Sequence, residues 1–271
     1  MSRQSIIENF KKTIWNFYYQ NKRNFLWREQ ISDYGVVISE VMLQQTQTHR
    51  VSKKYEDFIT AFPNFLTLAQ APFIEVLKIW KGLGYNRRAL NLQKIACIII
   101  EKFDQTLPKD ISILESLPGI GKATARSIYT FAFNTPSVFI ETNIRTVFLY
   151  FFFKDSKEPI HDKLIEELVA LTLDENNPRH WYYALMDYGA MLKKSSINLN
   201  NQSVHYKKQS AFIGSNRKVR GQILEFLLHN NDSNIGDLSK AFSNETHRLM
   251  PILKKLCDEG LVKNSNNKYF L

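Results

Sequence analysis

Cysteine is the rarest residue type in this sequence of 271 residues, which contains only Cys97 and Cys257. Two cysteines exclude a framework of several disulfides, and they cannot supply the four thiolates of a structural zinc or iron–sulfur site. Both lie in amphipathic helical patterns, where a thiol is most often a small core residue. The sequence therefore predicts no metal site.

The sequence also lacks a long hydrophobic run. The longest, at residues 146–153, is far too short to cross a bilayer, and the N-terminal residues lack the apolar segment and cleavage site of a signal peptide. Hydrophobic residues make up 44% of the chain and aromatic residues 13%, which indicates a folded core rather than disorder. These features predict a cytoplasmic protein with no membrane partner.

Acidic residues are scarce relative to basic ones, with 26 Asp and Glu against 36 Lys and Arg, a net charge of +10. Such an excess favours a polyanionic partner, most often nucleic acid, although an AT-rich genome also enriches lysine. The distribution says more than the total. Between Tyr188 and Leu224 there is no acidic residue, which is typical of an arm that faces phosphates.

Apolar residues recur at helical spacing along most of the chain as far as residue 195, which predicts an all-α protein. Residues 196–216 are rich in Ser, Asn and Lys and lack periodicity, as expected of a basic linker or arm. Residues 217–271 predict three helices and two short strands joined by an Asn-Asn turn, the pattern of a winged-helix domain. Such domains bind either DNA or protein, and both partners remain open.

The segment LPGIGKATA, residues 117–125, predicts a hairpin between two helices. Gly119 and Gly121 permit backbone angles and close approach that a side chain would block, and Lys122 adds positive charge at the start of the second helix. Helix N-termini of this kind bind anions, and for a basic protein the natural anion is a DNA phosphate. The alternative is a helix corner that merely uses glycine.

Two further segments combine polar and apolar residues in an informative way. Glu40 lies on an apolar helix, where a carboxyl group is either paired structurally or held with a raised pKa so that it can act as a general acid. Gln45 and Thr46 follow it, with hydrogen-bonding groups suited to reading the edges of bases. Leu83 and Tyr85 lie on a glycine-flanked turn that suits residues wedging into a base stack. The alternatives are an ordinary polar helix end and a capped helix end with packed side chains.

Three charged residues close to these segments are further candidates for a functional site. Arg87 and Arg88 follow Tyr85 in the sequence and are placed to contact phosphates. Glu141 follows an apolar run and opens a helix, a position at which an acid needs no functional explanation. As the second carboxylate of a pair, it would instead face positive charge developing on a sugar.

The segments SEVMLQQTQ, GLGYNRRALNL and LPGIGKATA resemble the helix-hairpin-helix DNA glycosylase superfamily in order and spacing, and most of all its A/G-specific adenine glycosylase branch. The resemblance covers residues 5–195. It implies a fold of two helical lobes with DNA between them. One lobe would comprise residues 28–135, and the other residues 1–27 with 136–195.

The resemblance also implies roles for the candidate residues. Glu40 matches the acid that protonates the departing purine, Glu141 lies where the family has an aspartate that stabilises the charged sugar, and Asn143 matches an asparagine beside that carboxylate. The resemblance also implies four contacts with DNA. Gln45 and Thr46 would touch the base opposite the extruded one, and Tyr85, next to Leu83, would insert into the base stack. Arg87 would contact a phosphate, and the hairpin residues Gly119, Gly121 and Lys122 would contact the DNA backbone.

The sequence departs from the family pattern in ways that bear on cofactors and chemistry. The cluster cysteines that should follow YGAML are absent, and Lys193 and Lys194 stand there instead, so no iron–sulfur cluster is expected. At most a monovalent cation is expected, at the hairpin. The winged helix replaces the family's usual module for 8-oxoguanine. Bifunctional members carry a nucleophilic lysine at the position of Ala123, whereas Lys122 points about 100° away around the helix.

The expected function is therefore that of a monofunctional DNA glycosylase of base excision repair. Its substrate would be adenine mispaired with 8-oxoguanine or guanine, in double-stranded DNA, and it would act as a monomer associated with the nucleoid. One alternative is a glycosylase for another mismatched, damaged or modified base, such as thymine in a T:G pair. The other is a DNA-binding protein that has lost catalysis, against which the presence of both Glu40 and Glu141 argues.

Overall fold

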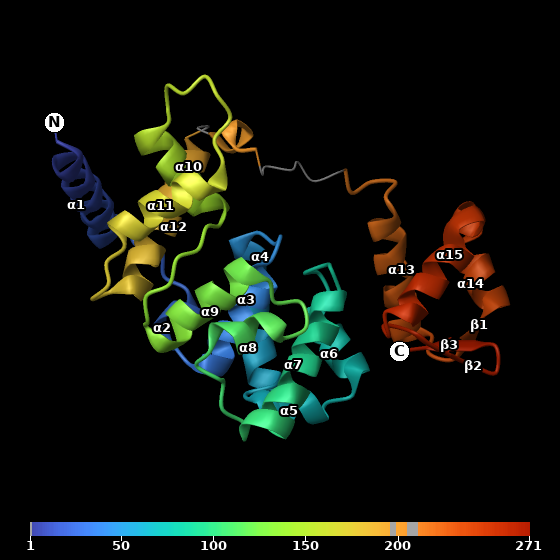
Figure 1. Ribbon diagram of the computed structural model, residues 1–271. Coiled ribbons are helices and arrows are strands. Elements are labelled where there is room, and N and C mark those ends of the chain that lie inside the picture. The colour runs from blue at the N-terminus through green and yellow to red at the C-terminus, as the bar shows by residue number, and fades with distance from the viewer. Residues whose placement is uncertain (1, 196–198, 205–210) are drawn as a thin grey trace. The chain divides into compact units, whose positions relative to one another are not determined.

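The computed structural model describes residues 2–195, 199–204 and 211–271 (Figure 1). Helices make up most of these residues, and a small antiparallel sheet lies near the C-terminal end of the chain. The predicted fold class, a helical protein with a C-terminal winged helix, is confirmed. The chain divides into two compact units, one formed by Met1–Glu40 with Pro108–Lys208 and the other by Val41–Leu107 with Gln209–Leu271.

The first unit is helical, with α10 packed on α12, α1 on α12, and α8 on α9. Helix α3 begins in this unit, and its last residues belong to the second. The elements are α1 (Arg3–Asn21), α2 (Leu26–Glu29), α3 (Asp33–Leu43), α8 (Ile111–Ser116), α9 (Lys122–Phe133), α10 (Thr142–Phe152), α11 (Asp162–Thr172), α12 (Pro178–Lys194) and the 3-10 helix η1 (Leu199–Gln202).

Buried aromatic rings hold α1, α10 and α12 together. The ring centroid of Phe10 in α1 lies 5.3 Å from that of Phe148 in α10 and 6.0 Å from that of Trp181 in α12. All three side chains are buried. Because each ring removes a large apolar area from water, these contacts stabilise the packing of the three helices.

Helix α12 approaches the first turn of α10 closely at Gly189. A Cβ at this position would overlap the backbone oxygen of Asn143 and would lie 2.7 Å from the Cβ of Asn143. Any side chain would therefore push the two helices apart. The absence of a side chain at Gly189 lets α12 hold the start of α10, which carries two of the candidate site residues.

The second unit contains the remaining helices and the sheet. Within it α5 packs on α7, and α6 packs on both α4 and α7. The elements are α4 (Thr48–Ala61), α5 (Phe65–Gln70), α6 (Phe73–Trp80), α7 (Arg87–Phe103), α13 (Asn216–His229), β1 (Ser233–Asn234), α14 (Ile235–Ala241), the 3-10 helix η2 (Ser243–Glu245), α15 (Thr246–Asp258), β2 (Lys263–Ser265) and β3 (Lys268–Phe270).

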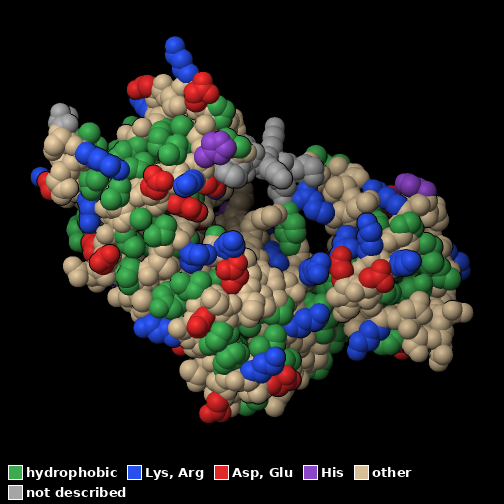
Figure 2. Space-filling view, in the orientation of Figure 1, with side chains coloured by type: hydrophobic (Ala, Val, Ile, Leu, Met, Phe, Trp, Pro, Cys, Tyr) green, Lys and Arg blue, Asp and Glu red, His purple; other side chains and the backbone are tan. Residues whose placement is uncertain are grey.

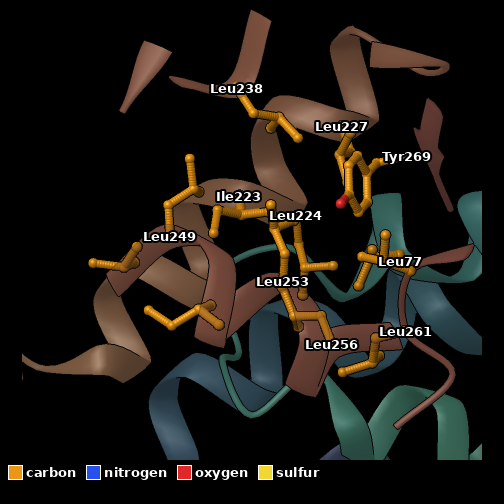
Figure 3. Close-up of a cluster of buried hydrophobic side chains, with 13 residues drawn as sticks. Leu77, Ile223, Leu224, Leu227, Leu238, Leu249, Leu253, Leu256, Leu261 and Tyr269 are labelled. Carbon is orange, nitrogen blue, oxygen red and sulfur yellow. The ribbon is translucent and has the colours of Figure 1, made fainter. Parts of the chain in front are cut away.

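Residues 216–270 form the winged helix, with strands in the order β1-β3-β2 and both pairs antiparallel. The strand β1 was not predicted, because a strand of two residues has no alternation to detect. Leucine and isoleucine side chains from α13, α14 and α15 form the core, and Leu77 of α6 joins the same cluster (Figure 3). An ion pair between Lys81 and Glu225, with 2.5 Å between nitrogen and oxygen, adds a polar contact.

The observed units group the helices differently from the expected lobes. The hairpin helices α8 and α9 were expected in one lobe with residues 28–107, whereas they cluster with α10–α12. The packing gives the reason, since Phe131 of α9 stacks on Tyr183 of α12 with 4.9 Å between ring centroids. Much of the expected linker, at residues 196–198 and 205–210, lies outside the described residues.

The described residues include no helix that is both long enough and apolar enough to cross a membrane.

The winged-helix core makes a direct stability prediction. Leu256 of α15 is fully buried, so Leu256→Ala leaves a cavity and should lower the free energy of unfolding by about 2–5 kcal/mol. Urea denaturation followed by circular dichroism measures this change. Met250 lies on the same helix with 52% of its surface exposed, and Met250→Ala should cost less than about 1 kcal/mol. Equal losses in the two variants would contradict the assigned core.

Candidate active site

The hairpin joins α8 to α9 through a turn that contains Gly119. This residue has a φ of +77°, a left-handed conformation that favours glycine. Gly121 caps α9 without a side-chain hydrogen bond and has a φ of −98°, which other residues adopt readily. A Cβ at Gly121 would meet no described atom within 4 Å. The fold itself therefore leaves space in front of this helix N-terminus, next to the exposed Lys122.

Glu40 lies near the end of α3 and contacts α9 through Ser127. The hydroxyl oxygen of Ser127 is 2.5 Å from Glu40 Oε2 and 3.0 Å from the backbone oxygen of Thr124. A hydroxyl can donate one hydrogen bond and accept others. Ser127 can therefore donate to an ionised Glu40, or it can accept from a protonated Glu40 and donate to Thr124. The contact accommodates both protonation states.

The environment of Glu40 favours its protonated form. Burial raises the pKa of Glu40 to about 7; the hydrogen bond from Ser127 lowers it, the Glu141 carboxylate raises it, and Arg28 lowers it. Burial dominates because a carboxylate loses hydration that few partners replace here. A carboxyl group with this pKa can donate a proton near neutral pH, as a general acid must.

A buried ion pair fixes the arginine near Glu40. Arg28 donates to both oxygens of Asp187, at 3.0 and 3.1 Å, and the Nε of Arg23 donates to the same carboxylate at 2.7 Å. The guanidinium of Arg28 also lies 4.2 Å from the ring centroid of Tyr183. Since one carboxylate, that of Asp187 on α12, binds two arginines, Arg28 is held in place and the cluster keeps one net positive charge near Glu40.

Glu141 is the N-cap residue of α10, and both of its carboxylate oxygens accept hydrogen bonds. Oε1 accepts from the backbone N–H of Asn143 at 2.8 Å and of Ile144 at 2.9 Å. Oε2 accepts from Thr142 Oγ1 at 3.2 Å and from Asn143 Nδ2 at 3.1 Å. Four donors and the positive end of the helix dipole hold the carboxylate of Glu141 in one orientation. The structural explanation for Glu141 is therefore correct, and it leaves a fixed negative charge near Glu40.

The first unit thus brings Glu40, Glu141 and Asn143 near one another, and it adds Ser127, Arg28 and Lys193, which were not predicted there. Lys193 enters because its Nζ donates to Asn143 Oδ1 at 2.8 Å. Ser127 could have been suspected as a hydroxyl on the buried face of α9. Arg28 and Lys193 carried no such signal, because their contacts join segments far apart in the sequence.

The candidate DNA-reading residues Gln45, Thr46 and Tyr85 lie in the second unit. Gln45 and Tyr85 are exposed and have φ values of +53° and +47°, uncommon for residues with side chains. Arg88 holds both turns. One of its nitrogens donates to the backbone oxygens of Met42 and Gln44, and the other to Thr46 Oγ1 and to Gly84 O.

Two expectations for this region are wrong. Arg88 was expected to contact phosphate, but it is only 7% exposed because its guanidinium binds the backbone oxygens of both turns. Leu83 was expected beside an intercalating residue, but its side chain is 2% exposed and belongs to the core, so it offers no surface to a base stack. Arg87 is exposed, as a phosphate contact requires.

Positive charge is not gathered in a single patch on the face that Figure 2 draws. On the face drawn in Figure 2, Lys and Arg side chains are interspersed with Asp and Glu rather than gathered in one patch. Part of the expected phosphate-facing arm is also engaged within the second unit. Arg217 donates to the hydroxyl of Tyr85 at 2.7 Å, and Arg220 pairs with Glu259 at 2.5 Å.

The residues present do not fit the family's iron–sulfur cluster. The sequence has two cysteines, and both lie in the second unit, on α7 and α15, whereas Lys193 stands at the end of α12. Among the described residues no group of three His, Cys, Asp or Glu side chains could hold a metal ion. Within residues 199–204, Ser203 forms a β-bridge with Ile160, and its hydroxyl lies 3.3 Å from Asp162 Oδ1.

Comparison with known proteins decides the family. Residues 38–171 match a family described as HhH-GPD superfamily base excision DNA repair protein. The adenine DNA glycosylase of Mycolicibacterium smegmatis is 30% identical over 229 residues, which cover 78% of this chain and 78% of that protein. The chain belongs to the HhH-GPD superfamily. The family predicted from the sequence segments is confirmed.

Two further matches describe how far the likeness extends. The adenine DNA glycosylase of Buchnera aphidicola subsp. Baizongia pistaciae is 38% identical over 188 residues, which cover 68% of this chain and 52% of that protein. The present chain thus spans about half the length of that relative. The solved structure of a thermostable thymine-DNA glycosylase has a TM-score of 0.61 and 24% identity, covering 75% of this chain and 97% of that one. This second likeness shows the HhH-GPD fold.

The raised pKa of Glu40 predicts a pH-dependent effect on stability. The pKa is about 7 in the folded protein against an ordinary value of 4.5, so the stabilising contribution of the protonated group is complete below pH 4.5 and is lost as the pH rises through 7. Glu40→Gln removes this loss. It should raise the free energy of unfolding by about 1–3 kcal/mol at pH 8 and give little or no gain at pH 4.5.

Urea denaturation at the two pH values measures this difference. Glu166→Gln, on the exposed surface of α11, provides the matched control and should behave alike at both. A gain in Glu40→Gln that is the same at pH 4.5 and pH 8 would show that Glu40 has an ordinary pKa.

Proposed function

We propose that this protein is a monofunctional DNA glycosylase that hydrolyses the N-glycosidic bond of adenine mispaired with 8-oxoguanine or guanine. The observation that carries the proposal is the pair of unlike carboxyl groups. Glu40 is half-buried, has a pKa raised by desolvation to about 7 and shares a hydrogen bond with Ser127, whereas Glu141 accepts four hydrogen bonds at a helix N-terminus. The adenine DNA glycosylases among its relatives support adenine as the base.

The two groups answer the two charges that develop when the bond breaks. The bonding electron pair leaves with the base, so negative charge develops on the purine and positive charge on the sugar. Protonated Glu40 donates its proton to a ring nitrogen of the base, which then leaves as a neutral molecule. The fixed carboxylate of Glu141 stabilises the sugar cation until water adds to it. Water supplies the hydroxyl of the abasic product, and its second proton returns the acid to Glu40.

A base inside a duplex cannot reach two half-buried carboxyl groups, so the target nucleotide must leave the stack. The exposed ring of Tyr85 would fill the gap, and Gln45 would read the base left behind, both held in left-handed backbone conformations by Arg88. The hairpin with Gly119, Gly121 and Lys122 would bind the DNA backbone at the N-terminus of α9. Double-stranded DNA with a mismatch or lesion is thus the partner, bound by a monomer in the nucleoid.

A second candidate substrate is another mismatched or damaged base, such as thymine opposite guanine. The observation that favours it is the winged helix at residues 216–270, where the resemblance to the family would lead one to expect a module for 8-oxoguanine. The chemistry of Glu40 and Glu141 would be unchanged, because only the reading of the base pair differs.

A panel of duplexes tests the proposal. Duplexes with A:8-oxoguanine, A:G, T:G, U:G and 8-oxoguanine:C pairs are incubated with the protein and then cleaved with alkali, which reports abasic sites. We expect cleavage at adenine in the first two. Glu40→Gln and Glu141→Gln should each lower the single-turnover rate by about 100-fold or more. Cleavage only at T:G or U:G would establish the second candidate, and tight binding without any cleavage would overturn both.

The position of Ala123 predicts how lyase activity could be introduced. Ala123 is exposed on α9, one turn before Ser127 on the same face, and Ser127 contacts Glu40. An amine at position 123 would therefore point along the same face as the acid, whereas Lys122 projects about 100° away. Borohydride should trap little covalent protein–DNA adduct with the wild type and much more with Ala123→Lys. Efficient trapping by the wild type would contradict the monofunctional assignment.

A further inference from the structure

Lys193 lies in the last turn of α12 with its amine turned inward. Its side chain is partly buried, and its Nζ donates to Asn143 Oδ1 at 2.8 Å. Burial lowers the pKa of Lys193, the Glu141 carboxylate raises it, and Arg145 lowers it, so Lys193 lies within electrostatic range of both charged groups. Removing an ammonium group from water is costly, and a single neutral amide oxygen compensates poorly. The position therefore requires an explanation beyond packing.

The amide of Asn143 connects Lys193 to Glu141. Asn143 Oδ1 accepts from Lys193, and Asn143 Nδ2 donates to Glu141 Oε2 at 3.1 Å. An ammonium group can only donate hydrogen bonds and a carboxylate can only accept them. Turning the amide over would place its NH₂ against the ammonium and its oxygen against the carboxylate. Lys193 therefore fixes the one orientation in which Asn143 supports Glu141.

The packing of α12 makes this contact rigid. Gly189 lies one turn before Lys193 on the same face of α12, and its missing side chain brings the helix against the backbone of Asn143. Thus one face of α12 contacts the backbone of Asn143 through Gly189 and its side chain through Lys193. The amine is delivered from a helix rather than from a mobile loop, which favours precise positioning.

We infer that Lys193 is a positioning residue for glycosidic bond cleavage, which orients Asn143 and through it holds the Glu141 carboxylate toward the sugar. The inference rests on the proposed function and deepens it. It also gives a role to the residue that stands where the family's cluster cysteines would begin. In this chain the end of α12 contributes a side chain to the site and supplies no metal ligand.

A simpler explanation is that Lys193 only stabilises α12. Basic side chains in a last helical turn interact favourably with the helix dipole, and Lys193 and Lys194 both occupy that turn. This explanation predicts a change in stability and an unchanged rate of base release. The two explanations therefore differ in what a neutral side chain of similar length does to the reaction.

The test measures single-turnover excision on whichever duplex of the panel the wild type cleaves fastest. Lys193→Met keeps the length of the side chain and removes the charge and the donor. We expect its rate to fall about 10-fold or more while the affinity for DNA changes less than about 2-fold. Lys193→Arg, which retains a charged donor, should recover part of the rate. The matched control is Lys12→Met on the exposed face of α1, which should match the wild type.

A double-mutant cycle with Asn143→Ala shows whether the effect passes through Asn143. If it does, adding Lys193→Met to Asn143→Ala changes the rate by less than about 2-fold, because the connection is already broken. Multiplicative losses would overturn the inference. Thermal unfolding and circular dichroism of each variant establish that it is folded, and Lys193→Leu, which also lacks the charge and the donor, replaces Lys193→Met if the latter is not.

The outcomes separate this inference from the proposed function. A wild-type protein that releases no base from any duplex overturns both. An active wild type whose rate is unchanged in Lys193→Met overturns only the role of Lys193 and leaves the glycosylase intact.

Discussion

The positions of the site residues in the first unit depend on the close contact between α12 and the first turn of α10. Because position 189 has no side chain, the backbone of α12 lies against Asn143, and the start of α10 cannot shift without disturbing the helix beside it. Glu141 caps that same turn, Asp187 of α12 anchors Arg28, and Lys193 reaches Asn143 one turn beyond Gly189. The close approach of α12 to α10 thus positions the Glu141 carboxylate and the Lys193 amine that reaches it through Asn143, and the same helix anchors Arg28.

The two glutamates illustrate how position decides the behaviour of one chemical group. Burial raises the pKa of Glu40 to about 7, and its contact with Ser127 suits a protonated or an ionised carboxyl group. Glu141 accepts four hydrogen bonds at a helix N-terminus, where negative charge is stabilised. The negative charge of Glu141 also disfavours ionisation of Glu40. The pair therefore favours a protonated Glu40 beside a Glu141 carboxylate. That division of roles is the chemical basis of the proposed reaction.

Arginine illustrates the opposite case, in which a residue expected at the surface serves the interior. Arg88 follows the exposed Arg87, and nothing in its sequence neighbourhood distinguishes the two. Its guanidinium is nevertheless buried, where it donates to backbone oxygens of two turns that carry Gln45 and Tyr85. Both residues have left-handed backbone conformations, which persist only where the surroundings enforce them. A buried guanidinium that joins two strained turns provides that enforcement within the second unit.

The sequence by itself determined the family, the helical class and the winged helix, and it predicted Glu40, Glu141 and Asn143 as candidate site residues, because helical periodicity, glycine positions and motif spacing are local properties. It also explained Glu141 as a helix cap. Only the tertiary structure decided that Leu83 and Arg88 are buried, that Ser127 contacts Glu40 and that Lys193 reaches Asn143. These facts depend on which segments far apart in the chain come together, and burial, pKa and hydrogen-bond partners follow from that packing alone.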